Sequence, residues 1–102
     1  MLRRSRFADL VGRQLDLFAT DESDLLEEAA AADEAWAHAS REDSEERYGE
    51  YQLVADTVAE RLYDVRERYA AALDEDTAGA YRAAFDRVAR KRFRPFAGLL
   101  EE

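Results

Sequence analysis

The sequence predicts an all-α protein, an antiparallel helical bundle of about four helices in which the third, about residues 45–73, is long and central. Between positions 48 and 73 apolar residues recur every three or four positions, the spacing of a helix that packs against other helices, as in a coiled coil. Ala supplies 20 of the 48 hydrophobic residues and favours helix more than any other residue. No stretch has the period of a strand. The heptad seam consists of Tyr48, Ala55, Leu62 and Tyr69 at one position and Tyr51, Val58, Val65 and Ala72 at the other.

Residues 1–102 are expected to form a single domain, because a chain of this length can build one core but not two. Ala buries little surface per residue, so the core of a monomer is expected to be thin. A thin core favours self-association.

The first two helices are predicted from their apolar faces. The first, about residues 5–18, is expected to face inward with Phe7, Leu10, Val11, Leu15, Leu17 and Phe18. Thr20 or Asp21 is the predicted N-cap of the second, because acidic residues crowd the turn that follows. The second helix runs to about residue 39 with Leu25, Ala29, Ala32, Trp36 and Ala39 on one face. Trp36 is therefore expected to be substantially buried against the third helix.

The third and fourth helices are delimited by short polar segments. Residues 40–44 lack apolar side chains, and Ser40 or Ser44 is the predicted cap of the third helix. Residues 74–77 predict a turn and the cap of the fourth helix, which runs to about residue 93 and ends before Pro95. Its inward residues are expected to be Tyr81, Ala84, Phe85 and Val88.

The net charge of −9 is unevenly distributed along the chain. Residues 1–15 and 78–102 each sum to +3, whereas residues 16–50 sum to −11 and residues 51–77 to −4. We interpret this pattern as basic terminal helices lying against acidic central ones, with a partner-binding face as the alternative.

The residue types exclude several chemistries. Without Cys there are no disulfides and no thiolate metal sites. Glu34 and the single His38 lie four apart but opposite Trp36, so we expect a solvated pair and not a metal site. Acidic pairs that would hold magnesium inside the bundle are missing, as are a nucleophile with its base and a glycine-rich phosphate loop. We therefore expect no enzyme activity, no metal and no cofactor.

Arg66 and a cluster of basic residues on the fourth helix each allow a structural and a functional interpretation. Arg66 adjoins the seam, and we expect it to pair with an acid across the helices and not to bind a free anion. On the fourth helix, Arg87, Arg90, Lys91 and Arg94 share one outward arc. Such an arc suits nucleic-acid phosphates, although the acidic chain makes a solvated or intramolecular face the preferred interpretation.

The function expected from these features is that of a small cytoplasmic interaction or adaptor protein acting through helix–helix contacts, most simply as a homodimer. Leu53 and Val54 lie outside the seam, and Phe93, Phe96, Leu99 and Leu100 add apolar surface at the end of the chain, so these residues are candidates for the interface. The alternative is a nucleic-acid-associated regulator that uses the Arg-rich last helix. No segment is apolar over the length of a membrane span, and the excess of Arg over Lys suggests a GC-rich bacterial genome.

Overall fold

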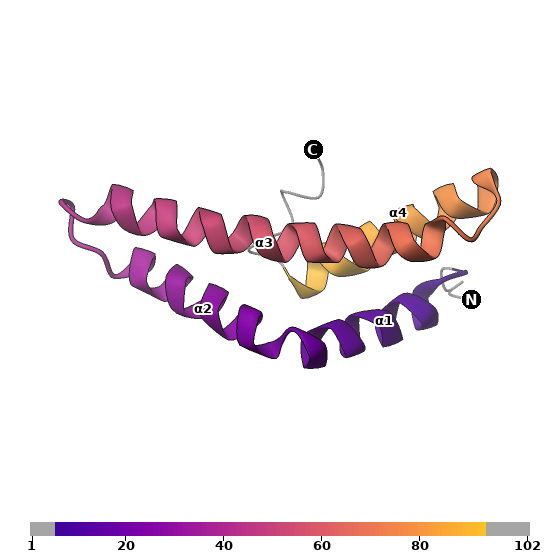
Figure 1. Cartoon of the computed structure of the whole chain (residues 1–102), viewed down its shortest axis with the longest axis horizontal. Coiled ribbons are helices and arrows are strands. Elements are labelled where there is room, and N and C mark those ends of the chain that lie inside the picture. Colours follow the sequence, from indigo (N-terminus) through magenta and orange to yellow (C-terminus); the bar gives the residue numbers. More distant parts are fainter. Residues whose placement is uncertain (1–5, 94–102) are drawn as a thin grey trace, which may run out of the picture.

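The computed structural model of the chain describes residues 6–93, which form four α-helices and no strand (Figure 1). The helices are α1 (Ala8–Asp21), α2 (Ser23–Ala37), α3 (Ser44–Ala70) and α4 (Glu75–Arg92). This confirms the all-α helical bundle with a long third helix. The 27 residues of α3 extend over about 40 Å, since an α-helix rises about 1.5 Å per residue.

Helices α1 and α2 follow one another with only Glu22 between them and meet at a bend (Figure 1). The predicted cap at Thr20 or Asp21 is wrong, because α1 continues through both residues. The Thr20 hydroxyl donates to the carbonyl oxygen of Asp16 one turn earlier, at 3.2 Å, and so does not cap α2. Glu22 occupies the N-cap position without a capping side-chain hydrogen bond.

The ends of α3 also differ from the prediction, whereas the start of α4 agrees with it. Asp43, not Ser40 or Ser44, precedes α3, and the helix ends at Ala70, three residues early. At α4 the carboxylate of Asp74 accepts a hydrogen bond from the backbone N–H of Thr77 at 2.9 Å, which confirms the cap.

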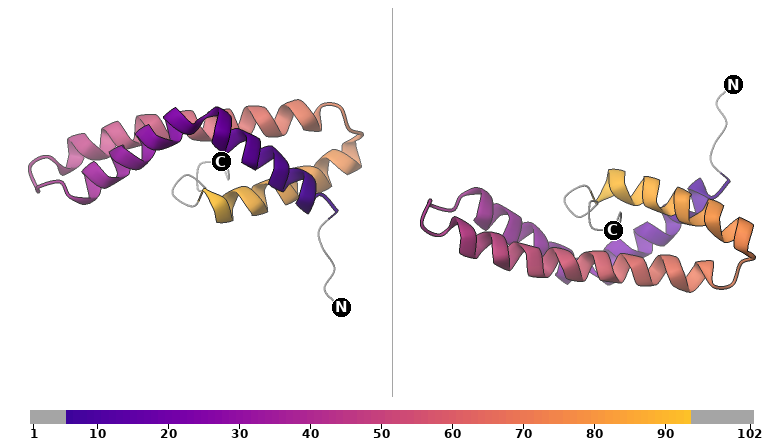
Figure 2. Two further views of the ribbon diagram at one scale, coloured as in Figure 1. Left: turned by 90° about the horizontal axis from the view of Figure 1, so that it is seen from below. Right: turned by 90° about the horizontal axis from the view of Figure 1, so that it is seen from above.

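The four helices form two regions that share α3 (Figure 2). In the arm, defined as residues 23–58, α2 runs antiparallel along the N-terminal half of α3. In the body, residues 6–22 and 59–93, both α1 and α4 run opposite to the C-terminal half of α3 and pack against each other. The bundle is thus two helices wide at one end and three at the other.

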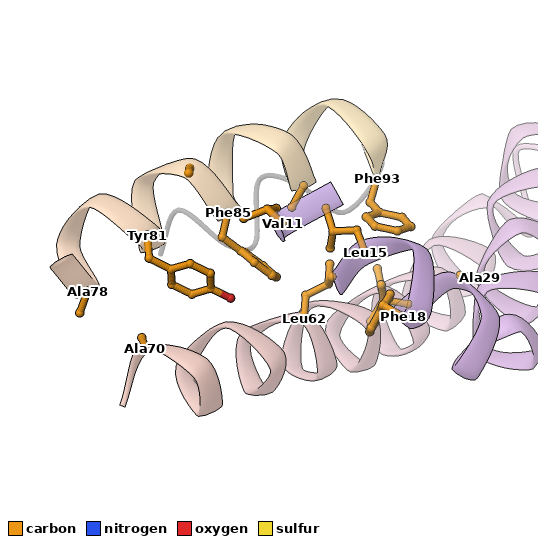
Figure 3. Close-up of a cluster of buried hydrophobic side chains, with 14 of the residues drawn as sticks. Val11, Leu15, Phe18, Ala29, Leu62, Ala70, Ala78, Tyr81, Phe85 and Phe93 are labelled. Carbon is orange, nitrogen blue, oxygen red and sulfur yellow. The ribbon is translucent and has the colours of Figure 1, made fainter. Parts of the chain in front are cut away.

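The larger buried side chains gather in the body (Figure 3). Leu15, Leu62, Tyr81 and Phe85 are fully buried there, as is Val11. The buried apolar residues of the arm are Ala29, Tyr51, Ala55 and Val58. Most of the heptad seam is buried or half-buried, but Ala72, which lies past the end of α3, is exposed and Tyr48 is 42% exposed.

Candidate interaction surfaces

A groove lies between α1 and the C-terminal half of α3. Helix α1 is held against α4: the ring of Phe7 packs edge-on to that of Tyr81, with centroids 5.6 Å apart, and the Tyr81 hydroxyl donates to Oε1 of Gln14 at 2.7 Å. The side of α1 that faces α3 is left partly uncovered. Two adjoining hollows of about 250 and 310 Å³ result, and both are lined by Gln14, Val65 and Arg68.

The groove has an apolar floor and a charged rim. The first hollow is completed by Leu17, Phe18, Asp21 and Glu22, and the second by Tyr69 and Ala72. Phe18 is buried and Val65 and Tyr69 are half-buried, whereas Leu17 is 63% exposed. The sequence prediction that Leu17 faces inward is therefore wrong, because α1 turns its core face toward α4. Leu17 stands beside the groove instead.

The charges on the rim of the groove are of both signs. Glu22 accepts two hydrogen bonds from Arg61, each of 2.9 Å. Asp21 and Arg68 are exposed, and within residues 6–93 neither forms an ion pair. The groove thus carries one acid and one base that remain open to an external partner.

No pattern in the sequence points directly to this groove, and the predicted interface residues that the structure describes, Leu53, Val54 and Phe93, do not line it. Leu53 is 71% exposed on the outer side of α3, as a partner-binding residue would be. Val54 is half-buried and packs against the hydrophobic core, so it does not join Leu53 in one exposed patch. The one sequence feature that indicates the groove is the wide apolar face of α1, which spans half of the helical wheel. One neighbouring helix covers less than half of the wheel, so part of this face is left for another contact.

The basic arc of α4 is only partly accessible. Arg87 and Lys91 are exposed and Arg90 is half-buried, while Arg94 and Phe96, like Leu99 and Leu100, lie outside the described residues. Two neighbouring arginines are engaged within the chain: Arg82 bonds Glu67, and Arg92 bonds Asp16 at 2.6 Å.

Arg66 pairs with an acid across the helices, as expected. Its side chain donates from Nη1 to Asp86 of α4 at 2.7 Å and from Nε to Glu67 at 2.9 Å, and the residue is only 9% exposed. Arg82 of α4 bonds the same Glu67 carboxylate through two nitrogens, each at 2.9 Å. These bonds hold the pKa of Glu67 below its usual value, and the bond from Arg82 has the largest effect. The network ties α3 to α4.

An aromatic cluster lies on the arm, where α2 faces the start of α3. The ring of Trp36 lies 4.7 Å from that of Tyr48 and 5.5 Å from that of Tyr51, between centroids. Trp36 packs on the third helix as predicted, but it is half-buried, because Tyr48 is itself exposed. Burial, followed by the nearby charge of Asp33, raises the pKa of Tyr51.

The arm carries the whole net charge of the protein. Residues 23–58 contain 11 acidic and 2 basic residues, a net charge of −9, and the remaining acids and bases are equal in number. The expectation that the two terminal helices lie against acidic ones is wrong for α1, which packs on α4. Apolar contacts decide this pairing, notably that of Phe18 with Phe93 at 5.6 Å between ring centroids.

The structure places no metal-binding group of three or more His, Asp or Glu side chains within residues 6–93. Nδ1 of the exposed His38 lies 3.0 Å from the backbone carbonyl oxygen of Glu34, a contact within the same helix turn. Across the same residues, none of the helices has the length and apolar character needed to cross a membrane.

Comparison with known proteins gives no relative: no protein-family model, no curated protein and no solved structure matches the chain.

Proposed function

We propose that this protein is a small, non-enzymatic interaction protein, an adaptor that accepts a helix in the groove between α1 and α3 and that also self-associates. The observation that carries the proposal is the exposed Leu17 beside an apolar hollow whose floor includes Phe18 and Val65. A groove with an apolar floor and charged rim residues suits the apolar face of an amphipathic helix. We further propose that it acts in the cytoplasm of a bacterium, as its composition suggests.

The size of the groove supports a helix as the bound element. Its lining begins at Val65 on α3 and reaches Ala72 just past the end of that helix, a span of about two helical turns. On the other side it runs from Gln14 to Asp21 on α1 and includes the following Glu22. This length suits the two or three anchoring side chains with which one helix docks on another. A small rigid ligand would be poorly enclosed in hollows that open to solvent along α1.

The proposal is tested by photo-crosslinking in living cells. A photoreactive amino acid is placed at Leu17 and, as a matched control, at Leu53, which is the same residue type and is also exposed but lies on the outer side of α3. We expect discrete adducts from position 17, to a second copy or to another protein, that disappear when Val65 is changed to Glu. The absence of adducts at position 17, or adducts only at position 53, would contradict the groove as the binding surface.

Binding of nucleic acid remains the second candidate, supported by the exposed Arg87 and Lys91 on α4. The arm, with its net charge of −9, would repel phosphates, and Arg82 and Arg92 are engaged by Glu67 and Asp16. We therefore expect no retention of a short DNA duplex at 50 mM salt. Tight binding that weakens steeply by 200 mM salt, and that Arg87→Glu abolishes, would favour this second function.

A further inference from the structure

We propose that the groove between α1 and α3 is covered by a second copy of this chain, in a two-fold dimer in which Leu17 of each copy enters the hollow of the other. This inference rests on the proposed function and names the occupant of its groove. A two-fold interface requires one surface to carry both a projecting element and the site that receives it. The projecting Leu17 and the hollow over Val65 lie on the same surface and line the same cavity.

The charges of the groove on one copy complement those of the same groove on a second copy. Asp21 and Arg68 both line the hollow of about 250 Å³ beside Leu17, are exposed, and form no ion pair within residues 6–93. A two-fold axis through the hollow brings Arg68 of each copy to Asp21 of the other, which gives two equivalent ion pairs. Charges arranged in this way fix the register of an interface more than its strength.

The net charge of the arm selects one orientation of the two copies. Each arm carries −9, so two arms side by side would repel each other. A two-fold axis perpendicular to α3 at the body groove makes the two α3 helices antiparallel and directs the arms to opposite ends. The body, residues 6–22 and 59–93, contains 11 acidic and 10 basic residues, so two bodies approach each other with little net repulsion.

The test uses two charge-reversed chains and their mixture. In Arg68→Asp dimers both ion pairs become acid–acid contacts, and in Asp21→Arg dimers both become base–base contacts. We expect each chain alone to self-associate at least tenfold more weakly than the wild type in sedimentation equilibrium. A mixture of the two chains restores both ion pairs across the interface, so the mixed dimer should form within about threefold of the wild-type affinity.

Matched controls separate this geometry from a general effect of charge. Arg41→Asp and Glu42→Arg change the net charge by the same amounts, but at exposed positions of the connection before α3. They should leave self-association unchanged, and circular dichroism of each chain alone should show an intact helical fold.

A wild-type chain that stays monomeric at micromolar concentration, or a mixture no stronger than its separate chains, would overturn the inference. If the wild type is monomeric while position 17 still crosslinks to another protein, the dimer and the proposed self-association are wrong, and the groove stands as the binding surface for that other protein. If position 17 yields no adducts at all, the proposed function fails as well.

Discussion

In the body, three helices enclose large side chains such as Leu15, Leu62 and Phe85. In the arm, two helices meet through a smaller buried set and several half-buried side chains; the buried residues are Ala29, Tyr51, Ala55 and Val58. Both regions use the same helix, α3, and their sequences are equally rich in helix-forming residues. The difference lies in what a third helix adds: a side chain between two helices remains open on two sides, and a third helix closes it. The stability of this fold is therefore expected to reside in the body.

Charge follows the same division. The arm carries the full net charge of −9 with only two basic residues, Arg41 and Arg47, among its acids. In the body, arginines bond acids across helices, as in Arg66 to Asp86 and Arg92 to Asp16. The region with the smaller core thus also bears the larger self-repulsion, and four predictions test how far the two regions differ.

The largest effect is expected from truncating the centre of the body. Phe85→Ala removes a fully buried ring that packs beside Tyr81, with ring centroids 6.0 Å apart. Loss of a buried Phe costs about 3–5 kcal/mol, so we expect the unfolding free energy to fall by that amount in urea titrations followed by circular dichroism. A loss below about 1 kcal/mol would show that the body is not the stable region.

The equivalent truncation in the arm should cost less. Trp36 is half-buried against Tyr48 and Tyr51, so Trp36→Ala forfeits only part of its burial, and we expect a loss of about 2 kcal/mol in the same titrations. A loss of unfolding free energy as great as that of Phe85→Ala would show that packing in the arm contributes as much to stability as packing in the body.

The ion network of the body should make its stability depend on pH. The pKa of Glu67 is lowered by its bonds from Arg82 and Arg66. The contribution of Glu67 to the free energy of unfolding is therefore complete above the ordinary pKa of a glutamate. It is lost as the pH falls through the lowered pKa of Glu67. Glu67→Gln should cost about 1 kcal/mol at pH 7 and reduce the loss of stability between pH 5 and pH 3. An unchanged acid limb of the pH profile would contradict this role.

The smallest effect is expected from salt. Raising the ionic strength from about 0.02 to 0.5 M shortens the Debye length from roughly 20 Å to about 4 Å and so screens the acids of the arm from one another. Amide exchange in α2 should slow severalfold, which corresponds to less than about 1 kcal/mol, while exchange in α4 changes little. Faster exchange in α2 with salt would mean that attraction, not repulsion, dominates the arm.

The sequence was sufficient for features that depend on local chemistry and periodicity. The heptad seam predicted α3. Residues 74–77 predicted the N-terminal cap of α4, because Asp74 and Thr77 form hydrogen bonds within one turn. The cap at Thr20 failed because the hydroxyl of a helical Thr bonds back to its own helix. Polar residues alone do not show whether a chain leaves a helix or merely bends.

The groove could not be predicted in the same way. Its existence depends on the angle at which α1 lies across α4, and that angle is set by contacts such as Phe7 with Tyr81, 74 residues apart in sequence. The same angle turns Leu17 outward and leaves Val65 half-covered. Sequence periodicity defines which face of a helix is apolar but not which neighbour covers which part of it.

The contrast between arm and body is tested most directly by amide hydrogen exchange measured residue by residue along α3, the one helix that both regions share. Local stability follows the burial around each hydrogen bond, so protection should be high from Leu62 to Ala70 and fall by at least tenfold toward Tyr51. A step of this kind near residue 58 is the predicted result. Uniform protection from one end of α3 to the other would contradict the division of the molecule into a stable body and a weakly packed, acidic arm.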